Sequence, residues 1–218
     1  MIDYGNRPRL EFPTGERVLA AAESLFGERG YHGTHLRELA AVVGIQKASL
    51  FYHFSSKEEL YRSVLRRSAG EIGAELQRTL TENAPFRDRL RLLVGTYVGL
   101  ATERPARTRM LLRELIEGLP LASKAVLHEF EPVFSIVVDF VREGQRAQVF
   151  RQVDPAPLIL SIMGMAAFFV AVAPAIAPKW VAEVRSRGDM AKAVTAFLIE
   201  IVEPMLLAGE QPQAALER

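Results

Sequence analysis

Apolar residues recur every three or four positions along most of this chain, which is the spacing that places them on one face of an α-helix. The first such stretch begins at Thr14, a residue type that caps helix N-termini, and we expect Gly30 to end it. Sustained alternation of apolar and polar residues, which is typical of strands, does not occur in the sequence. The pattern therefore predicts an all-α protein of about nine helices.

Capping residues and prolines mark the boundaries of the later helices. Ser56 followed by Glu59 matches a capping box, so a long helix is expected from there to about Thr81. The last helix carries an apolar face made of Met190, Val194, Phe197, Ile201 and Met205. Between these two, the pattern predicts helices over 86–103, 106–118, 121–150 and 155–173, and the last helix spans 189–207.

Residues 158–177 contain no charged side chain and could represent either a transmembrane helix or a helix buried on all sides. Pro174 and Pro178 interrupt the segment, which leaves about fifteen residues of good helix where a bilayer needs about 20. We therefore favour burial, in a core or between two protomers, and expect no membrane partner.

The segment 34–54 joins two short helices through a glycine. Helices that cross closely need a small residue at their contact, which Ala40 supplies, and Gly44 can adopt the left-handed conformation of the turn. Apolar residues lock the second helix onto the first: Leu39, Val43, Ile45, Leu50 and Phe54. The side chains left facing outward are types that suit phosphates and base edges: Gln46, Lys47, Ser49, Tyr52 and His53. The sequence predicts a helix-turn-helix over 35–54.

The stretch from about Thr14 to Leu65 resembles the DNA-binding domain of TetR-family regulators. The resemblance is carried by AAESLFGERGYHGTHLRELAAVVGI and by QKASLFYHFSSKEELY, with its aromatic-His-Phe signature and its Lys-Glu at the start of the fourth helix. It implies a DNA-binding domain over 12–72 and a C-terminal ligand-binding and dimerisation domain over 73–210. The rest of the chain resembles the family only in the number, length and arrangement of its helices.

The resemblance also implies which residues approach DNA. It places four side chains of the recognition helix against DNA: Lys47, Ser49, Tyr52 and His53. It places Thr34 and Arg37 near the DNA backbone, and Lys57 near phosphate at a helix N-terminus.

Two residues depart from the family pattern. Gln46 stands where a serine or threonine commonly caps the recognition helix, so that either the cap is weaker or Gln46 itself reads a base. Phe51 stands where many members carry a tyrosine whose hydroxyl meets phosphate. That contact should be absent here, or Tyr52 replaces it.

Charge and composition narrow the class of protein. The whole chain has a formal net charge of +1, but residues 34–67 hold six basic side chains against three acidic ones. An excess of positive charge that could attract nucleic acid is therefore found locally, in this segment. The absence of cysteine excludes disulfides and thiolate metal sites, and the opening residues have no apolar run of signal-peptide length. We expect a cytoplasmic protein with no cofactor and no metal. No catalytic triad, P-loop or dinucleotide fingerprint occurs, so we expect no enzyme.

Adaptable apolar side chains in the C-terminal part are candidates for an effector pocket, with ordinary core packing as the alternative. They are Met110, Phe134, Met163, Met165, Phe168 and Phe169. The sequence thus favours a ligand-responsive transcriptional repressor that binds near-palindromic operator DNA as a homodimer and responds to a small, largely apolar effector. The alternatives are a constitutive DNA-binding regulator with no ligand, and a helical small-molecule carrier or enzyme.

Overall fold

The structure, a computed structural model, describes residues 14–81, 83–117, 124–186 and 190–207. These residues form eleven helices and no strands, which confirms the all-α prediction with two helices more than the nine expected. The helices are α1 (Thr14–Gly33), α2 (Leu36–Val43), α3 (Lys47–His53), α4 (Lys57–Leu80), α5 (Phe86–Glu103), α6 (Pro105–Ile116), α7 (Lys124–Arg146), α8 (Pro155–Ala171), α9 (Ala173–Ile176), α10 (Pro178–Ser186) and α11 (Met190–Leu206).

The two additional helices are α9, at the end of the uncharged segment 158–177, and α10, which directly follows it. Pro174 lies in the first turn of α9 and Pro178 begins α10, positions where a proline is tolerated because its missing N–H would have no helical partner. Each proline therefore starts a new short helix after α8 ends at Ala171. Among the described residues, no helix is long and apolar enough to cross a membrane.

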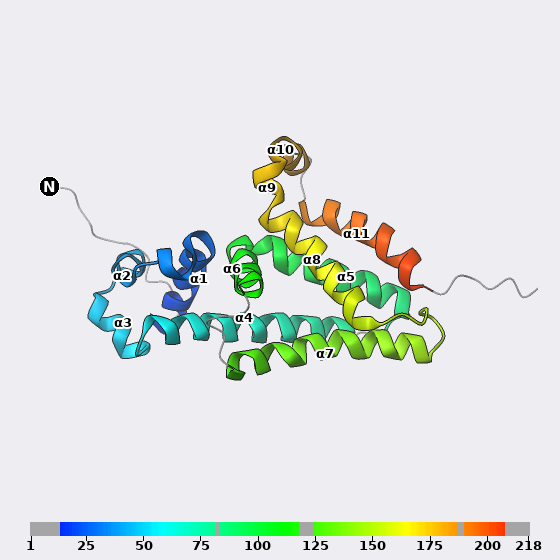
Figure 1. The fold of residues 1–218 in the computed structure, drawn as a ribbon, viewed down its shortest axis with the longest axis horizontal. Coiled ribbons are helices and arrows are strands. Elements are labelled where there is room, and N and C mark those ends of the chain that lie inside the picture. The colour runs from blue at the N-terminus through cyan, green and yellow to red at the C-terminus, as the bar shows by residue number, and fades with distance from the viewer. Residues whose placement is uncertain (1–13, 82, 118–123, 187–189, 208–218) are drawn as a thin grey trace, which may run out of the picture.

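The helices enclose two apolar cores that are joined by α4. Helices α1–α3 lie at one end of the molecule, and α8 and α11 lie towards the other (Figure 1). The N-terminal core contains Val18, Phe26, Leu39, Leu50, Leu60 and Met110 among others. The C-terminal core contains Leu93, Val98, Phe140, Phe150 and Leu198 among others. The expected boundary between residues 72 and 73 falls inside α4, whose first half supplies Leu60 to one core and whose second half supplies Leu76 to the other.

Helix α6 contacts the C-terminal end of α1. Gly30 has the left-handed backbone conformation (φ 73°) and interrupts α1, so that carbonyls just before it lose the regular helical pattern. Arg113 donates to the carbonyl of Phe26 at 3.0 Å, and Arg109 reaches that of Gly27 at 3.5 Å. These carbonyls carry the negative end of the helix dipole, which favours cations at this position.

Buried charges surround the same contact. Arg104, at the junction of α5 and α6, pairs with Glu23 of α1 at 3.2 Å. Arg107 of α6 is nearly fully buried and pairs with Glu71 of α4 at 3.2 Å, and it also donates to the carbonyl of Leu100 at 2.8 Å. Burial raises the pKa of Glu23 despite the arginines beside it. Three helices are thus held together by ion pairs in each of which one partner is buried and the other is partly exposed.

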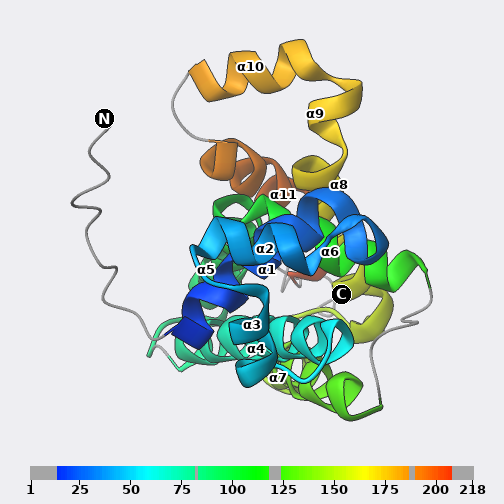
Figure 2. The ribbon, with the colours of Figure 1, turned by 90° about the vertical axis from the view of Figure 1, so that its left-hand side faces the viewer.

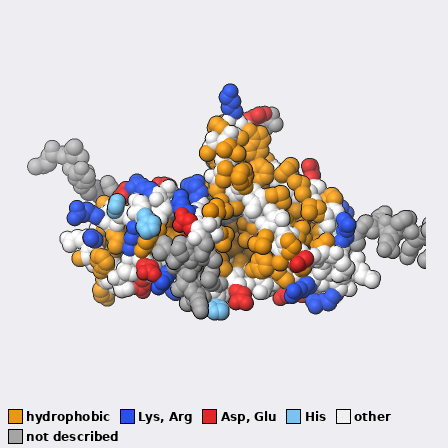
Figure 3. All heavy atoms as spheres, viewed as in Figure 1, with side chains coloured by type: hydrophobic (Ala, Val, Ile, Leu, Met, Phe, Trp, Pro, Cys, Tyr) orange, Lys and Arg blue, Asp and Glu red, His pale blue; other side chains and the backbone are white. Residues whose placement is uncertain are grey.

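The opposite end of the molecule has an outer apolar face. Leu160 and Phe168 of α8, and Phe197 and Met205 of α11, are exposed large side chains. Figure 3 shows hydrophobic side chains gathered over α8 and over the projecting helices α9 and α10. Contiguous apolar surface of this kind marks sites that other molecules cover.

We predict opposite effects for two glycine substitutions. A Cβ at Gly27 would overlap the backbone carbonyl of Ala106, so Gly27→Ala must push α6 away from α1 and should lower the free energy of unfolding by about 2 kcal/mol. Gly70 lies within α4, and an added Cβ there would have no atom within 4 Å. Gly70→Ala should therefore raise the free energy of unfolding by about 0.5–1 kcal/mol. Urea denaturation measures both. Equal effects of the two variants would contradict the close contact between α1 and α6.

Candidate nucleic-acid interface

The turn between α2 and α3 has the geometry of a helix-turn-helix. Gly44 ends α2 in the left-handed conformation (φ 76°), and its N–H bonds to the carbonyl of Ala41 at 3.2 Å. The N–H of Ile45 bonds to the carbonyl of Ala40 at 2.9 Å, and Leu50 anchors α3 in the N-terminal core. These contacts leave α3 at the end of the molecule, towards the viewer in Figure 2.

The structure brings together five predicted DNA contacts around α3. All five are exposed: Gln46, Lys47, Ser49, Tyr52 and His53. Tyr52 is 88% exposed, which is the largest value among the exposed large hydrophobic side chains. Gln46 is the N-cap residue of α3 but its side chain makes no capping hydrogen bond, which agrees with the weaker cap expected there. Arg37 is exposed on the neighbouring helix α2.

Thr34 does not join this surface. It is completely buried, and its hydroxyl donates to the carbonyl of Leu25 at 3.1 Å and to that of Gly30 at 2.8 Å. Thr34 does not cap α2 either, because His35 occupies the N-cap position and makes no side-chain capping bond. The break at Gly30 explains the difference, since it exposes carbonyls that a buried hydroxyl must satisfy.

Lys57 lies at the start of α4, and its ammonium sits 4.5 Å from the ring centre of Tyr31. Burial lowers the pKa of this lysine. The helix begins as predicted, because the Ser56 hydroxyl accepts from the N–H of Glu59 at 3.0 Å. The Glu59 carboxylate accepts from the N–H of Ser55 at 2.7 Å, one residue earlier than in a regular capping box. Lys57 is therefore held at a fixed helix terminus.

The six candidate ligand residues do not form one site. Met110 is buried in the N-terminal core with α1–α4, so its surroundings are those of a core residue. Phe168 is 51% exposed on the outer apolar face. Four half-buried residues pack against the C-terminal core: Phe134, Met163, Met165 and Phe169.

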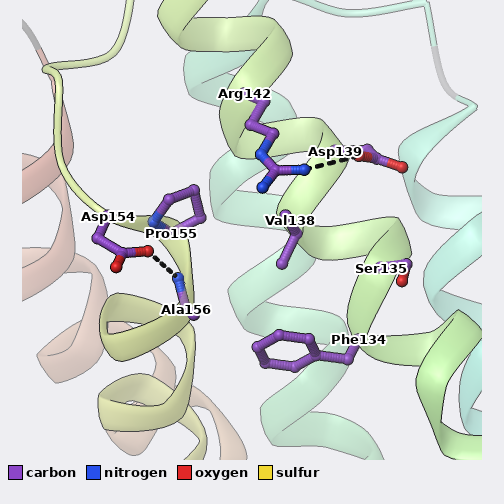
Figure 4. Close-up of a pocket in the computed structure, with 8 residues that line it drawn as sticks. All are labelled: Phe134, Ser135, Val138, Asp139, Arg142, Asp154, Pro155 and Ala156. Atoms are coloured by element: carbon purple, nitrogen blue, oxygen red, sulfur yellow. Dashed lines mark hydrogen bonds and ion pairs between the residues drawn. The ribbon is translucent and has the colours of Figure 1, made fainter.

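A groove of about 290 Å³ opens between α7 and the start of α8 (Figure 4). Phe134 and Val138 supply its apolar lining, and Asp139, Arg142 and Asp154 supply charge. The Asp154 carboxylate accepts from the N–H of Ala156 at 3.1 Å, as expected for the N-cap of α8. Of these residues, only Phe134 was a ligand candidate from the sequence. The polar residues were missed because they follow the solvent-facing pattern of an amphipathic helix, which gives no sequence signal for a groove.

Tyr97 of α5 ties the C-terminal core to α8. Its hydroxyl donates to the carbonyl of Met163 at 3.3 Å, and burial raises its pKa to about 12. The phenol is therefore a neutral hydrogen-bond donor at physiological pH. Tyr97 was not among the sequence candidates, because a single tyrosine in an apolar helix does not reveal what its hydroxyl meets.

Two family models match the chain, one in its N-terminal part and one in its C-terminal part. The model of bacterial regulatory proteins of the tetR family matches residues 18–64, and the tetracyclin repressor-like C-terminal domain matches residues 83–170. The HTH-type transcriptional regulator RutR of Escherichia coli (strain K12) is 26% identical over 176 residues, which cover 79% of this chain and 81% of RutR.

Solved structures share the fold. AibR, solved in complex with isovaleryl coenzyme A and operator DNA, has a TM-score of 0.70 at 19% identity and covers 88% of this chain and 99% of its own. The ketosteroid transcriptional regulator KstR2 of Mycobacterium tuberculosis has a TM-score of 0.70 at 22% identity, over 92% of this chain and 97% of its own. The two family models and the match to RutR, together with the exposed helix α3, define a helix-turn-helix transcriptional regulator. The chain belongs to the TetR family.

We predict that Thr34→Val lowers stability without weakening DNA contacts. The variant leaves the carbonyls of Leu25 and Gly30 without their buried donor, which costs about 1–3 kcal/mol of unfolding free energy. Thr81→Val is the control, because that hydroxyl is exposed at the end of α4 and its loss should change stability by less than about 0.5 kcal/mol. Operator affinity, measured well below the melting temperature, should stay within about twofold of wild type. A large loss of affinity in the stably folded variant would place Thr34 at the DNA after all.

Proposed function

We propose that this protein is a ligand-responsive repressor that binds near-palindromic operator DNA as a homodimer in the cytoplasm. The observation that carries the proposal is α3, a short helix anchored by Leu50 and exposing polar and aromatic side chains at the end of the molecule. A helix of this kind enters the major groove, where Gln46, Lys47 and Ser49 can reach base edges and phosphates. Arg37 and Lys57 flank it as phosphate contacts. The proposed role is regulatory and involves no catalysis.

The outer apolar face supports dimerisation. Leu160, Phe168, Phe197 and Met205 expose apolar surface on two neighbouring helices, and α8 and α11 pack on each other in the protomer. Two copies related by a twofold axis would bury this face as a four-helix interface. Such a dimer would carry its two α3 helices about 34–36 Å apart, one turn of DNA.

Support for an effector comes from the C-terminal part. The half-buried residues Phe134, Met163, Met165 and Phe169 pack against the C-terminal core, and Phe134 also lines the groove between α7 and α8. Adaptable apolar side chains of these types suit a small, largely apolar effector. Solved neighbours in the fold include regulators of ligands with an apolar part: AibR was solved with isovaleryl coenzyme A, whose acyl group is apolar although its coenzyme A part is charged, and KstR2 is a ketosteroid regulator. The groove is the proposed entrance for the effector. Phe134 belongs both to the groove and to the group of half-buried candidate residues.

Helix α6 is the proposed link between effector and DNA. It packs on α8 on one side and on α1 on the other, where Arg113 holds the carbonyl of Phe26. An effector that displaces α8 would therefore move α1 and change the separation of the two α3 helices. A 100-fold loss of DNA affinity requires the effector to prefer the released conformation by about 2.7 kcal/mol.

We predict that Lys47→Ala combined with Tyr52→Ala abolishes specific DNA binding. Gel shifts on operator DNA obtained by random-sequence selection should show at least a 100-fold loss of affinity, about 2.7 kcal/mol, because both half-sites lose base and phosphate contacts. The slope of log affinity against log salt should fall by about 2, one for each lysine of the dimer. Lys179→Ala removes an exposed lysine from α10 and should change neither quantity. Unchanged binding by the double variant would exclude α3 as the recognition helix.

We predict that Phe168→Glu combined with Phe197→Glu yields a folded monomer. The twofold axis brings each new carboxylate into the buried face of the other protomer, and unpaired buried charges are strongly unfavourable. Sedimentation velocity should show half the mass of the wild type with unchanged helical circular dichroism. Val42→Glu, at a residue of α2 that is 62% exposed, is the control and should remain dimeric. A dimeric double variant would assign the interface to another surface.

A further inference from the structure

Helix α3 exposes an apolar ring beside its polar side chains. Phe51 is 46% exposed although it directly follows Leu50, which is buried in the N-terminal core. Successive helical residues are rotated by about 100°, so Phe51 lies on a flank of α3, between the buried side and the outermost side that carries Ala48 and Tyr52. The ring is thus available to whatever α3 contacts.

The only apolar group that a DNA major groove offers at a base edge is the 5-methyl of thymine. Phe51 has no hydroxyl, so it cannot donate to a phosphate or to a base, whereas its exposed ring gains free energy by covering a methyl group. We propose that Phe51 is a specificity residue that selects thymine, through its 5-methyl group, at one position of each operator half-site. This inference rests on the proposed binding of DNA through α3.

Lys47 holds this ring in place. Its ammonium lies 5.8 Å from the centre of the Phe51 ring, and the two residues are four positions apart on the same flank of α3. A cation in this position is attracted to the face of the ring, which restricts the rotamers of both side chains. Phe51 and Lys47 therefore meet DNA together, with the ring against the methyl and the ammonium against a neighbouring phosphate or guanine edge.

The experiment removes only the methyl group. Operator DNA is obtained by random-sequence selection with the full-length protein, and each thymine of a half-site is replaced in turn by deoxyuridine. Covering one methyl-sized group is worth about 0.8 kcal/mol, or about fourfold in affinity. We expect one thymine per half-site at which uracil weakens binding about fourfold, and about 16-fold when both half-sites are changed. Replacement of the same thymine by 5-methylcytosine should retain part of the methyl contact.

Variants assign the effect to Phe51. Phe51→Ala should bind thymine and uracil operators equally well, and Phe51→Gln is a second variant should the alanine variant not fold. Val42→Ala, an exposed apolar residue of α2, is the matched control and should keep the full sensitivity to uracil. Thermal unfolding checks that each variant is folded.

Two failures are distinguishable. DNA binding that depends on Lys47 and Tyr52 but shows no uracil sensitivity overturns the role of Phe51 and leaves the proposed function intact. The same conclusion follows if the sensitivity persists in folded Phe51→Ala or Phe51→Gln. If the selection recovers no DNA that the wild type binds, the proposed function itself is overturned.

Discussion

The contact between α1 and α6 is the constraint on which the rest of the structure depends. Gly27 lies so close to the backbone of Ala106 that no side chain would fit between them. The turn at Gly30 leaves carbonyls that accept hydrogen bonds from Arg113 and Thr34. The N-terminal core is completed only because this contact brings Met110 of α6 against α1. The helix-turn-helix is therefore built on a helix that belongs, in sequence, to the C-terminal part.

Buried charge strengthens this constraint. An unpaired carboxylate or guanidinium at the position of Glu23 or Arg107 would be strongly unfavourable, so each requires its partner from another helix. The Glu23–Arg104 pair joins α1 to the start of α6, and the Arg107–Glu71 pair joins α6 to α4. Together these pairs favour movement of the three helices as a unit over gradual sliding. That is the mechanical property a regulator needs if a change near α8 is to reach α3.

The end of the molecule formed by α3 combines rigid anchoring with exposed side chains. Leu50 and the Gly44 turn hold α3, and the Ser56 cap and the ring of Tyr31 position Lys57. The side chains proposed to contact DNA project from this frame, and the fixed position of the helix would lower the entropy lost on binding. The proposed role of the exposed Phe51 ring would give this surface a preference that charge alone would not supply.

The sequence by itself determined the boundaries of most helices, the helix-turn-helix and the exposed residues of α3, because caps, glycine turns and the 3.6-residue period are local properties. It did not predict α9 and α10. Tertiary structure decided which faces are buried. The last helix carries apolar residues on two adjacent stripes. The stripe that lies in the core consists of Val194, Leu198, Val202 and Leu206. Phe197 and Met205, which belong to the predicted apolar face, are exposed. Likewise, Thr34 is buried and Met110 lies in the N-terminal core. Local spacing cannot reveal such placements, because they depend on which distant helix packs against each face.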